Sequence, residues 1–570
     1  MNYSFFKTAL LSKTVLFVLL TSVFISCSRD PLKEYDSQIE TDLMPIKEFY
    51  KDDFPVGAAI EPFQVEKAEG ALLRYHYNSI TCENAMKFKS IHPKQKVYNF
   101  KAADRIVEFA KRYNMKMRGH TFVWHHPAEQ VFWIFLNNDG SKRSRESVLE
   151  LLGEHMQTLV DRYGDTIYAW DVVNEAIDIA EPDNMRKSQW YHSIGPDYVT
   201  EAFKLARKAA PDALLFYNDY DFFNPIKRDA IYDLVKRSIE QGAPIDGIGM
   251  QMHINNGTPT VESIEAAIEK FRDLGLQIHI TEFDISMYAH EYDKFDSPSE
   301  EHIASQANRY KLFFQLFQKH KDIVTNVTFW GFNNGHTFLT GAPYNRPDWP
   351  FPFDENFQHT TAYKGIMQSD ELPEYKPLLA VTEVKKYEAP KGTPVIDANI
   401  DAVWEKAPIV KTETIVVGDK PSIASVRVLW DKDYLYFLAE VEDSDLFLNA
   451  PEKYMNDSFE VFIDENNGKT PVYEQDDFQF RVDYENLLTI GGYSDSSMIK
   501  SAAKKAGKGY IVEARFKLQT VKAAPGLVMG LDFQVNQNDG SGQRTAIAKW
   551  NDLTNESWRS TAGWGLVELK

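Results

Sequence analysis

The first two-thirds of the chain alternate between short apolar runs of strand character and longer amphipathic segments. Amphipathic helix patterns lie, for example, at 102–113, 147–163 and 262–275. The strand-like runs are VGAAI (56–60), SITCENAMK (79–87), KMRGHTFVW (116–124), IYAWDVVNE (167–175), ALLFYNDYD (213–221), DGIGMQMHI (246–254), QIHITEFDI (277–285) and VTNVTFWGF (324–332). Eight buried strands that alternate with helices favour a closed (β/α)8 TIM barrel, which we place at 45–385.

The alternative α/β architecture is a doubly wound open sheet. Such sheets usually bind a nucleotide through a glycine-rich loop after the first strand. No such loop follows 56–60, which disfavours this alternative and also an enzyme of the barrel class that acts on phosphorylated metabolites.

Polar and aromatic residues collect in the C-terminal halves of the predicted strands. They are Glu83, Asn84, Lys87, His120, Trp124, Asn174, Glu175, Asn218, Asp219, Gln251, His253, Glu282 and Trp330. In a barrel this end binds substrate, and buried polar groups are costly without a purpose or partners. Any one of them could be structural, for example a strand-capping ion pair, but the ring as a whole predicts a substrate site.

The C-terminal third has a different pattern. After a Pro/Gly/Lys-rich linker at 386–394, the chain turns to short alternating runs separated by Asp, Asn and Gly. These runs lie at 425–430, 434–443, 458–464, 478–484, 509–518 and 528–536. Short strands with regular turn signals predict an all-β sandwich domain over 395–570.

The first 27 residues have the pattern of an export signal. Lys7 and Lys13 precede an apolar stretch at 15–25 that is too short to span a bilayer, and Ser26 precedes Cys27. This resembles a bacterial lipoprotein signal with Cys27 as the lipidated residue; a plain secretory signal is the alternative. Residues 28–44 are predicted to be a tether. With Cys27 lipidated, Cys82 has no disulfide partner.

Composition limits the classes of partner. The net charge of −20 disfavours nucleic acid, and 13% aromatic residues suit stacking on neutral sugars or simply the filling of a large core. The chain has neither CxxC pairs nor an HExxH motif, so we expect no catalytic metal and no required cofactor.

Several motifs together resemble glycoside hydrolase family 10, the endo-β-1,4-xylanases. They are TCENAMK (81–87), RGHTFVWH (118–125), WDVVNEA (170–176), NDYD (218–221), MQMHI (250–254), ITEFDI (280–285) and FDENFQHTTAY (353–363). The resemblance implies a retaining hydrolase with Glu175 as acid/base and Glu282 as nucleophile. It also implies that the sugars beside the scissile bond are held by Glu83, Asn84, Lys87, His120, Trp124, Asn174, Gln251, His253 and Trp330.

The chemistry of these roles is general. Retaining enzymes place two carboxyls about 5–5.5 Å apart, and two such close carboxylates do not both ionise readily. We expect Gln251 and His253 to hydrogen-bond Glu282, and Asn174 to hold the sugar 2-hydroxyl. His253 could instead be a core histidine, and Lys87 could be a barrel ion-pair partner.

Two positions depart from the family pattern. Where Trp-His-Ser-Gln is usual, Trp124-His125 runs into His126-Pro127, so the glutamine contact is replaced, with His126 or Gln130 as stand-ins. Phe338 stands where a second tryptophan is usual; it keeps an apolar wall but loses area and the indole N–H.

Residues 392–570 resemble carbohydrate-binding module family 9. The matching segments are GTPVIDANIDAVW (392–404), VRVLWDKDYLYF (426–437), DSFEVFIDENN (457–467), QFRVDY (479–484) and SWRS (557–560). The resemblance implies an aromatic clamp of Tyr454 and Trp558 with polar contacts from Glu460, Arg481 and Asn555, and it allows structural calcium. Tyr454 replaces the usual tryptophan; the alternative is that both aromatics are edge packing.

Together these features predict an exported, lipid-anchored endo-1,4-β-xylanase at a bacterial outer membrane or cell surface. We expect a monomer that acts on xylan and xylo-oligosaccharides and meets the membrane only through its lipid. A broad-specificity β-1,4-glycanase and a catalytically weak xylan-binding protein are the alternatives.

Overall fold

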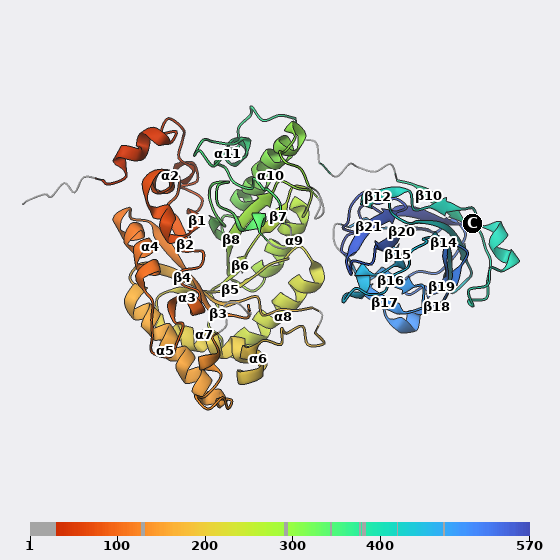
Figure 1. Ribbon diagram of the computed structural model, residues 1–570, viewed down its shortest axis with the longest axis horizontal. Helices are drawn as coiled ribbons and strands as arrows, with labels where there is room; N and C mark the ends of the chain where they lie inside the picture. Colours follow the sequence, from red (N-terminus) through yellow and green to blue (C-terminus); the bar gives the residue numbers. More distant parts are fainter. Residues whose placement is uncertain are drawn as a thin grey trace, which may run out of the picture.

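The computed structural model describes residues 30–126, 131–179, 181–289, 294–341, 345–374, 378, 384–418, 420–470 and 473–570. The chain forms an N-terminal α/β domain and a C-terminal β domain, which lie side by side (Figure 1). The predicted signal segment and Cys27 lie outside the described residues. Within the described residues, no helix combines the length and the apolar character needed to cross a membrane.

In the described part of the N-terminal domain, eight parallel strands form a closed barrel. The strands are β1 (Val56–Ile60), β2 (Ser79–Cys82), β3 (Lys116–Trp124), β4 (Ile167–Asn174), β5 (Leu214–Asp219), β6 (Gly247–Met250), β8 (Gln277–Ser286) and β9 (Val324–Phe329). Neighbours pair in chain order, β9 returns to β1, and the pairing of β6 with β8 completes the circle. The predicted barrel is confirmed.

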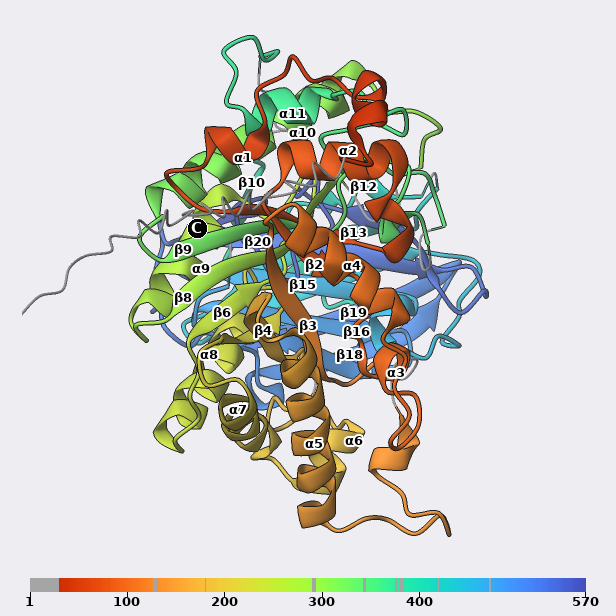
Figure 2. The ribbon, with the colours of Figure 1, turned by 90° about the vertical axis from the view of Figure 1, so that its left-hand side faces the viewer.

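Helices surround the barrel, as the view in Figure 2 shows for α2, α4 and α5. Their bounds are α1 (Ile46–Phe49), α2 (Lys67–His76), α3 (Phe88–Ile91), α4 (Lys101–Arg112), α5 (Arg145–Tyr163), α6 (Gln189–Ile194), α7 (Tyr198–Ala209), α8 (Pro225–Glu240), α9 (Val261–Arg272), α10 (Glu300–Lys319) and α11 (Thr361–Ile366). Short 3-10 helices are η1 (Lys33–Gln38), η2 (Pro62–Val65), η4 (Phe132–Ile134) and η5 (Phe338–Thr340). Each long helix buries one apolar face; in α4 the buried residues are Ala103, Ile106, Val107, Phe109 and Ala110.

One predicted strand is broken in two. The run at 246–254 forms β6 and then a separate short strand, β7 (His253–Asn255), which among the described strands pairs with β8 alone. Met252 lies between them with φ of 61°, a left-handed conformation that a continuous strand cannot contain. The break places Gln251 and His253 on separate backbone segments at the barrel mouth.

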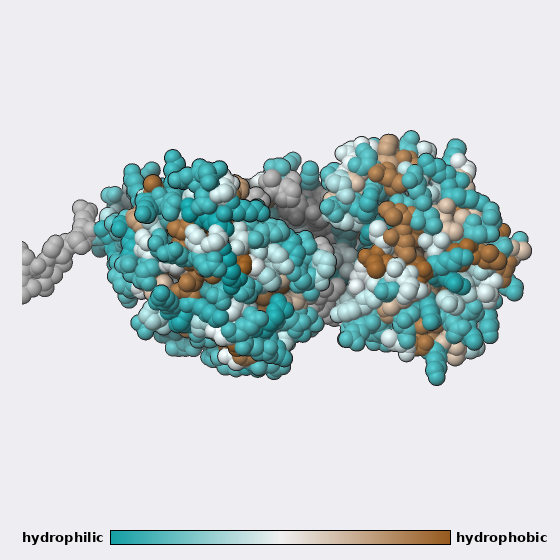
Figure 3. Space-filling model, turned by 90° about the horizontal axis from the view of Figure 1, so that it is seen from below, coloured by the Kyte–Doolittle hydropathy of each residue, from teal (hydrophilic) through white to brown (hydrophobic). Residues whose placement is uncertain are grey.

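The C-terminal domain consists of two packed sheets, as predicted for a sandwich. One sheet follows the order β10-β22-β20-β15-β16-β17; β21 also pairs with β20, and β12 pairs with β21. The other sheet follows the order β11-β13-β14-β19-β18. Their bounds are β10 (Lys386–Ala389), β11 (Val410–Lys411), β12 (Thr414–Val417), β13 (Ile423–Trp430), β14 (Tyr434–Glu442), β15 (Ser458–Asp464), β16 (Asp477–Asp483), β17 (Leu488–Gly492), β18 (Ile499–Ala506), β19 (Gly509–Lys517), β20 (Val528–Asn538), β21 (Arg544–Lys549) and β22 (Gly565–Leu569), with 3-10 helices η6 (Ala402–Lys406), η7 (Lys453–Met455) and η8 (Ser496–Met498). On the face that Figure 3 shows, hydrophilic residues cover most of the barrel domain, and apolar residues gather in groups on the sandwich.

Two segments predicted to be connectors belong to the folded domains. From Asp30 onward the predicted tether packs on the barrel: Leu32 and Ile39 are buried, and Arg74 pairs with Asp36. In the predicted linker, Lys386–Ala389 forms β10 and pairs in parallel with β22. In both segments only a few side chains face the folded domain, so most of their residues are polar. Composition alone therefore predicts a connector for each.

Candidate active site in the barrel and sugar pocket in the sandwich

The predicted polar ring gathers at one end of the barrel. Glu175 directly follows β4, Gln251 follows β6, and Trp330 follows β9, while Glu282 lies within the C-terminal half of β8. Because parallel strands all end at the same edge, these residues meet at the barrel mouth although they are far apart in the chain.

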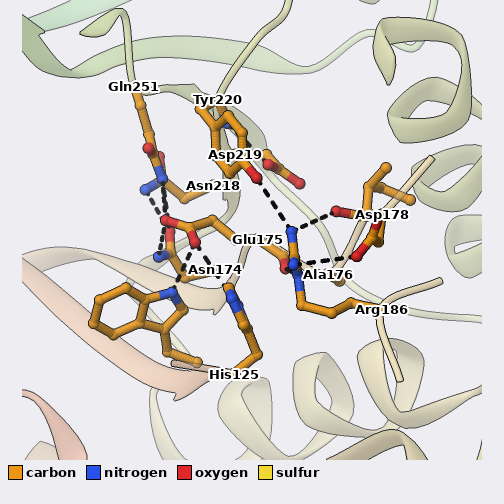
Figure 4. Close-up of polar contacts among 12 residues, drawn as sticks. His125, Asn174, Glu175, Ala176, Asp178, Arg186, Asn218, Asp219, Tyr220 and Gln251 are labelled. Carbon is orange, nitrogen blue, oxygen red and sulfur yellow. Dashed lines mark hydrogen bonds and ion pairs between the residues drawn. The ribbon is translucent and has the colours of Figure 1, made fainter. Parts of the chain in front are cut away.

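Side chains from several strands converge on the carboxylate of Glu175, among them Asn174 and Gln251 (Figure 4). Trp124 Nε1 donates to Glu175 Oε2 at 2.9 Å, and the amides of Asn174 and Gln251 each donate to Oε1 at 3.0 Å. His125 Nδ1 lies 3.7 Å from Oε2. The side chain is 15% exposed, so these contacts hold the carboxyl in place while leaving it accessible from the cleft.

The backbone at Glu175 is also held in an unusual conformation. Its φ of 59° lies in the left-handed region, which is unfavourable for a glutamate. Its N–H donates to the carbonyl of Asn218 at 2.9 Å, and Arg186 Nε donates to its carbonyl at 3.1 Å. These contacts fix the turn that directs the side chain into the mouth.

Glu282 is more deeply buried and has different partners. Asn218 Nδ2 donates to its Oε1 at 2.7 Å, and His253 Nε2 lies 3.1 Å from its Oε2. Burial alone would raise the pKa of Glu282, but the hydrogen bond with His253 and the charges of His120 and His253 outweigh it and hold this pKa below its usual value. Glu282 is therefore held as a carboxylate.

A second carboxylate stands behind His253. Asp284 Oδ2 lies 2.7 Å from His253 Nδ1, on the far side of the ring from Glu282. Burial by itself would lower the pKa of His253, but the charges of Asp284 and Glu282 raise it well above its usual value. The imidazole therefore carries its proton and faces the Glu282 carboxylate as a cation.

One amide network joins the two glutamates, and it corrects one expectation. Gln251 was expected beside Glu282, but its amide donates to Glu175 Oε1 and to Asn174 Oδ1 (3.2 Å). Asn218 occupies the expected position and also donates to Asn174 Oδ1 at 2.8 Å. The reason is the break after β6, which separates Gln251 from His253 and turns it toward β4.

The residues that follow β2 line another side of the mouth. Asn84 donates to Glu61, Lys87 Nζ donates to Asn84 Oδ1 at 2.7 Å, and Glu83 Oε2 lies 3.2 Å from His336 Nε2. Lys87 Nζ also lies 4.7 Å from the centre of the Trp124 ring. Lys87 thus contacts an amide oxygen and an aromatic face, and its charge also acts on the nearby Glu61 carboxyl.

Aromatic rings complete the mouth. The Trp330 ring meets His120 edge to face at 5.2 Å, and Phe338, which is 45% exposed, meets His253 at 4.9 Å. His126 stacks on Trp124 with ring centres 4.9 Å apart, whereas Pro127 and Gln130 lie outside the described residues. Of the stand-ins for the usual glutamine, His126 is thus adjacent to the site.

A separate cavity of about 440 Å³ opens on the sandwich. All five predicted module residues line it: Tyr454, Glu460, Arg481, Asn555 and Trp558. Tyr454 and Trp558 are 38% and 43% exposed, so neither is buried as edge packing. Exposed aromatic faces beside polar groups are suited to a sugar ring.

The floor of this cavity is a buried ion pair. Arg481 Nη2 donates to Glu460 Oε1 at 2.5 Å, and Gln479 donates to the same oxygen at 2.6 Å. Burial alone would raise the pKa of Glu460, but the charge of Arg481 and these hydrogen bonds hold it below its usual value. Among the described residues, no cluster of three potential metal ligands was found, so calcium in the module stays a prediction.

Sequence reasoning missed several residues that orient the predicted ones. Asn218 appeared in the ring without a role, and Asp284 was not considered, although it lies two positions after Glu282 and so on the same face of β8. In the sandwich, Gln479, Gln534 and Arg544 also line the cavity. Alternation along β16 could have indicated Gln479, which is two positions before Arg481.

Comparisons with known proteins match both domains. Residues 45–369 match the profile of "Glycosyl hydrolase family 10", and residues 396–570 match "Carbohydrate family 9 binding domain-like". Endo-1,4-beta-xylanase A of Thermotoga maritima is 33% identical over 96% of this chain and 67% of its own length. Endo-1,4-beta-xylanase B of Paenibacillus barcinonensis is 42% identical over 58% of this chain and its full length.

Solved structures show the same barrel. The crystal structure of an endo-1,4-beta-xylanase from Caldicellulosiruptor owensensis is 42% identical, with a TM-score of 0.55 over 57% of this chain and 99% of that one. The chain spans about two thirds of the length of the Thermotoga relatives. The family profile covers more than half of the chain: the chain belongs to glycosyl hydrolase family 10.

Proposed function

We propose that this protein is a retaining endo-1,4-β-xylanase. The observation that carries the proposal is the unequal setting of the two glutamates. Glu282 is buried, accepts from Asn218, faces protonated His253 and stays ionised, as a nucleophile requires. Glu175 stands at the mouth and is oriented by Trp124, Asn174 and Gln251, as a proton donor requires.

The reaction then proceeds in two balanced steps. A Glu282 oxygen attacks the anomeric carbon, the glycosidic C–O bond breaks, and the Glu175 proton moves to the departing oxygen. In the second step Glu175 takes a proton from water, the resulting hydroxide attacks the same carbon, and the Glu282 ester bond breaks. Both steps invert the anomeric carbon, so the product retains the β configuration.

The surrounding amides support the same steps. Asn174 donates to Glu175 and is held by the Asn218 amide, which also donates to Glu282; at this position it can contact the 2-hydroxyl of the sugar. A hydrogen bond at this position strengthens in the oxocarbenium-like transition state. Release of reducing sugar from xylan by the full-length chain tests the proposal, and its absence would favour the xylan-binding alternative.

Specificity for xylose over glucose is expected from the side of the cleft after β2. Glu83, Asn84 and Lys87 are fixed by neighbouring groups and present hydrogen-bonding atoms to secondary hydroxyls, while Trp330 limits the room for a hydroxymethyl arm. An apolar wall alone discriminates by only ~1–3 kcal/mol, or about 10–200-fold. We expect kcat/KM on xylo-oligosaccharides to exceed that on matched cello-oligosaccharides by at least about tenfold.

The Phe338→Trp variant sharpens this prediction. A larger ring on the exposed wall should lower activity on cello-oligosaccharides more than on xylo-oligosaccharides, and so raise the ratio. Phe49→Trp is the matched control, because Phe49 is an exposed phenylalanine on α1. Comparable kcat/KM for the two sugars in the parent chain would support a broad-specificity β-1,4-glycanase instead.

The sandwich is proposed to bind sugar through its own cavity. Tyr454→Ala should reduce retention on insoluble xylan, whereas Tyr454→Trp should increase it by providing a larger stacking face. Depletion assays on full-length chains measure this, and hydrolysis of a short oligosaccharide by the barrel reports the integrity of each preparation. Equal retention of both variants and the parent would assign the domain a spacer role.

Export and anchoring are proposed from the sequence pattern that ends at Cys27. A lipid on this cysteine would hold the enzyme at a membrane surface, with the barrel facing its polymeric substrate. Cys27→Ser expressed in a bacterial host should move the protein from the detergent phase to the aqueous phase of a detergent partition. Partition of the parent into the aqueous phase would favour the plain secretory signal.

A further inference from the structure

A cavity of about 400 Å³ lies between the barrel and the sandwich. Its barrel side includes His253 and Phe338 from the catalytic mouth, and its sandwich side includes Asn555 and Trp558. The same Asn555 and Trp558 also line the sugar pocket of the sandwich. The catalytic mouth and the sugar pocket are therefore joined by a continuous lining that contains an exposed tryptophan.

Arg559 holds the two domains in this arrangement. Its Nη2 donates to Thr258 Oγ1 of the barrel at 2.8 Å, and its guanidinium lies 4.2 Å from the centre of the Phe223 ring. It also pairs with Glu556 within the sandwich. The Arg559 side chain is only 10% exposed, so this cation–π and hydrogen-bonded contact is largely shielded from water.

The loop after β17 lies near the barrel as well. Tyr493, which follows β17, is close enough to α8 that burial and the charge of Asp229 together raise its pKa. In Figure 1 the sandwich lies beside the part of the barrel that carries α8 and α9, away from α2 and α4.

The position of the cavity indicates which end of a bound substrate would reach it. Its barrel residues lie in β7 and β8 or follow β5, β7 and β9. The proposed glycone contacts Glu83, Asn84 and Lys87 follow β2, across the barrel from β6. A xylan chain that binds beside β2 and is cleaved between the two glutamates would continue toward β5, β6 and β7. The sandwich side of the cavity, with Asn555 and Trp558, therefore lies on the leaving-group side of the substrate.

We propose that Trp558 and Asn555 form a sugar subsite of the catalytic cleft, so that one β-1,4-linked pyranose chain is held by both domains at once. This rests on the proposed function. Trp558, 43% exposed, offers a face for a sugar ring, and Asn555 offers an amide for hydroxyls. Such a site needs the docked arrangement, and so it depends on Arg559.

The test uses full-length parent, Arg559→Ala and Trp558→Ala chains on soluble xylo-oligosaccharides of increasing length. For the parent, kcat/KM should keep rising for oligosaccharides longer than the barrel mouth can hold. The reason is that a substrate held by both domains binds more tightly. Arg559→Ala should match the parent on short substrates, fall about tenfold behind on long ones, and keep its retention on insoluble xylan.

Two further measurements separate docking from sugar contact. Small-angle X-ray scattering should show a larger radius of gyration for Arg559→Ala and a parent-like one for Trp558→Ala, which should nevertheless lose the gain with length. Arg427→Ala, which removes an arginine of the other sheet paired with Glu440, should behave as the parent in every assay.

Two results would overturn the shared subsite. The first is that kcat/KM of the parent stops rising once the oligosaccharide is long enough to fill the barrel mouth. The second is that Arg559→Ala and Trp558→Ala both gain kcat/KM with substrate length as the parent does. Either can occur while xylan is still hydrolysed and insoluble xylan still bound, so the proposed function would stand. A parent chain that releases no sugar from xylan would instead refute the function itself.

Discussion

Glu282→Ala is expected to reduce hydrolysis below detection on every substrate, whereas Glu175→Ala should spare substrates with good leaving groups. Without Glu282 no glycosyl ester forms. Without Glu175 the departing oxygen lacks a proton, which costs about 10²–10⁴-fold on xylan but little on an activated aryl xyloside. Azide should then enter the open space beside the ester and restore turnover of Glu175→Ala.

The azide product identifies each role. Glu175→Ala should give a β-xylosyl azide, detected by NMR, because the second displacement restores the original configuration. Glu282→Ala should give no β-azide. Glu150→Ala, which removes an exposed glutamate of α5, is the control and should leave activity unchanged. Equal losses of both variants on activated and natural substrates, with no rescue, would contradict the assignment.

The second large effect is expected on stability and concerns an ion pair inside the barrel. Arg118 is fully buried and donates to Asp171 through both Nη1 (3.1 Å) and Nη2 (2.6 Å), while His120 Nδ1 lies 2.9 Å from the same carboxylate. Asp171→Ala leaves a buried cation unpaired. We expect the barrel to lose about 3–5 kcal/mol of unfolding free energy, measured by urea denaturation.

An exposed pair provides the matched comparison. Arg145 binds Asp197 through two contacts of 2.7 Å at the surface, with 35% and 39% of the side chains exposed, so Asp197→Ala should cost only about 0–1 kcal/mol. Equal losses of unfolding free energy in Asp171→Ala and Asp197→Ala would show that burial does not determine how much the Arg118–Asp171 pair contributes to stability.

The effect of Asp171→Ala should also depend on pH. Burial alone would raise the pKa of Asp171, but the charge of Arg118 and the contact with His120 outweigh it and hold this pKa below its usual value. The contribution of the pair is therefore complete above the usual aspartate pKa and is lost as the pH falls through the folded-state pKa. The difference between parent and variant should shrink in acid.

Much of this molecule could be predicted from local patterns. The run 56–60 became β1 and 116–124 became β3 without change, since their bounds follow from apolar content and flanking polar residues. Glu175 and Glu282 were found because each lies toward the C-terminal end of such a run, and that end of a parallel barrel faces the substrate. In the sandwich, all five predicted residues line one cavity.

The sequence by itself thus determined the barrel, the sandwich and which carboxylates meet at the mouth, because these depend on periodicity and strand direction. Only the tertiary structure decided that Gln251 contacts Glu175, that Asn218 contacts Glu282, and that β10 completes the sandwich. It also placed Arg559 on Thr258. Each of these contacts joins residues distant in the chain, and their geometry follows from packing and backbone turns that no local pattern encodes.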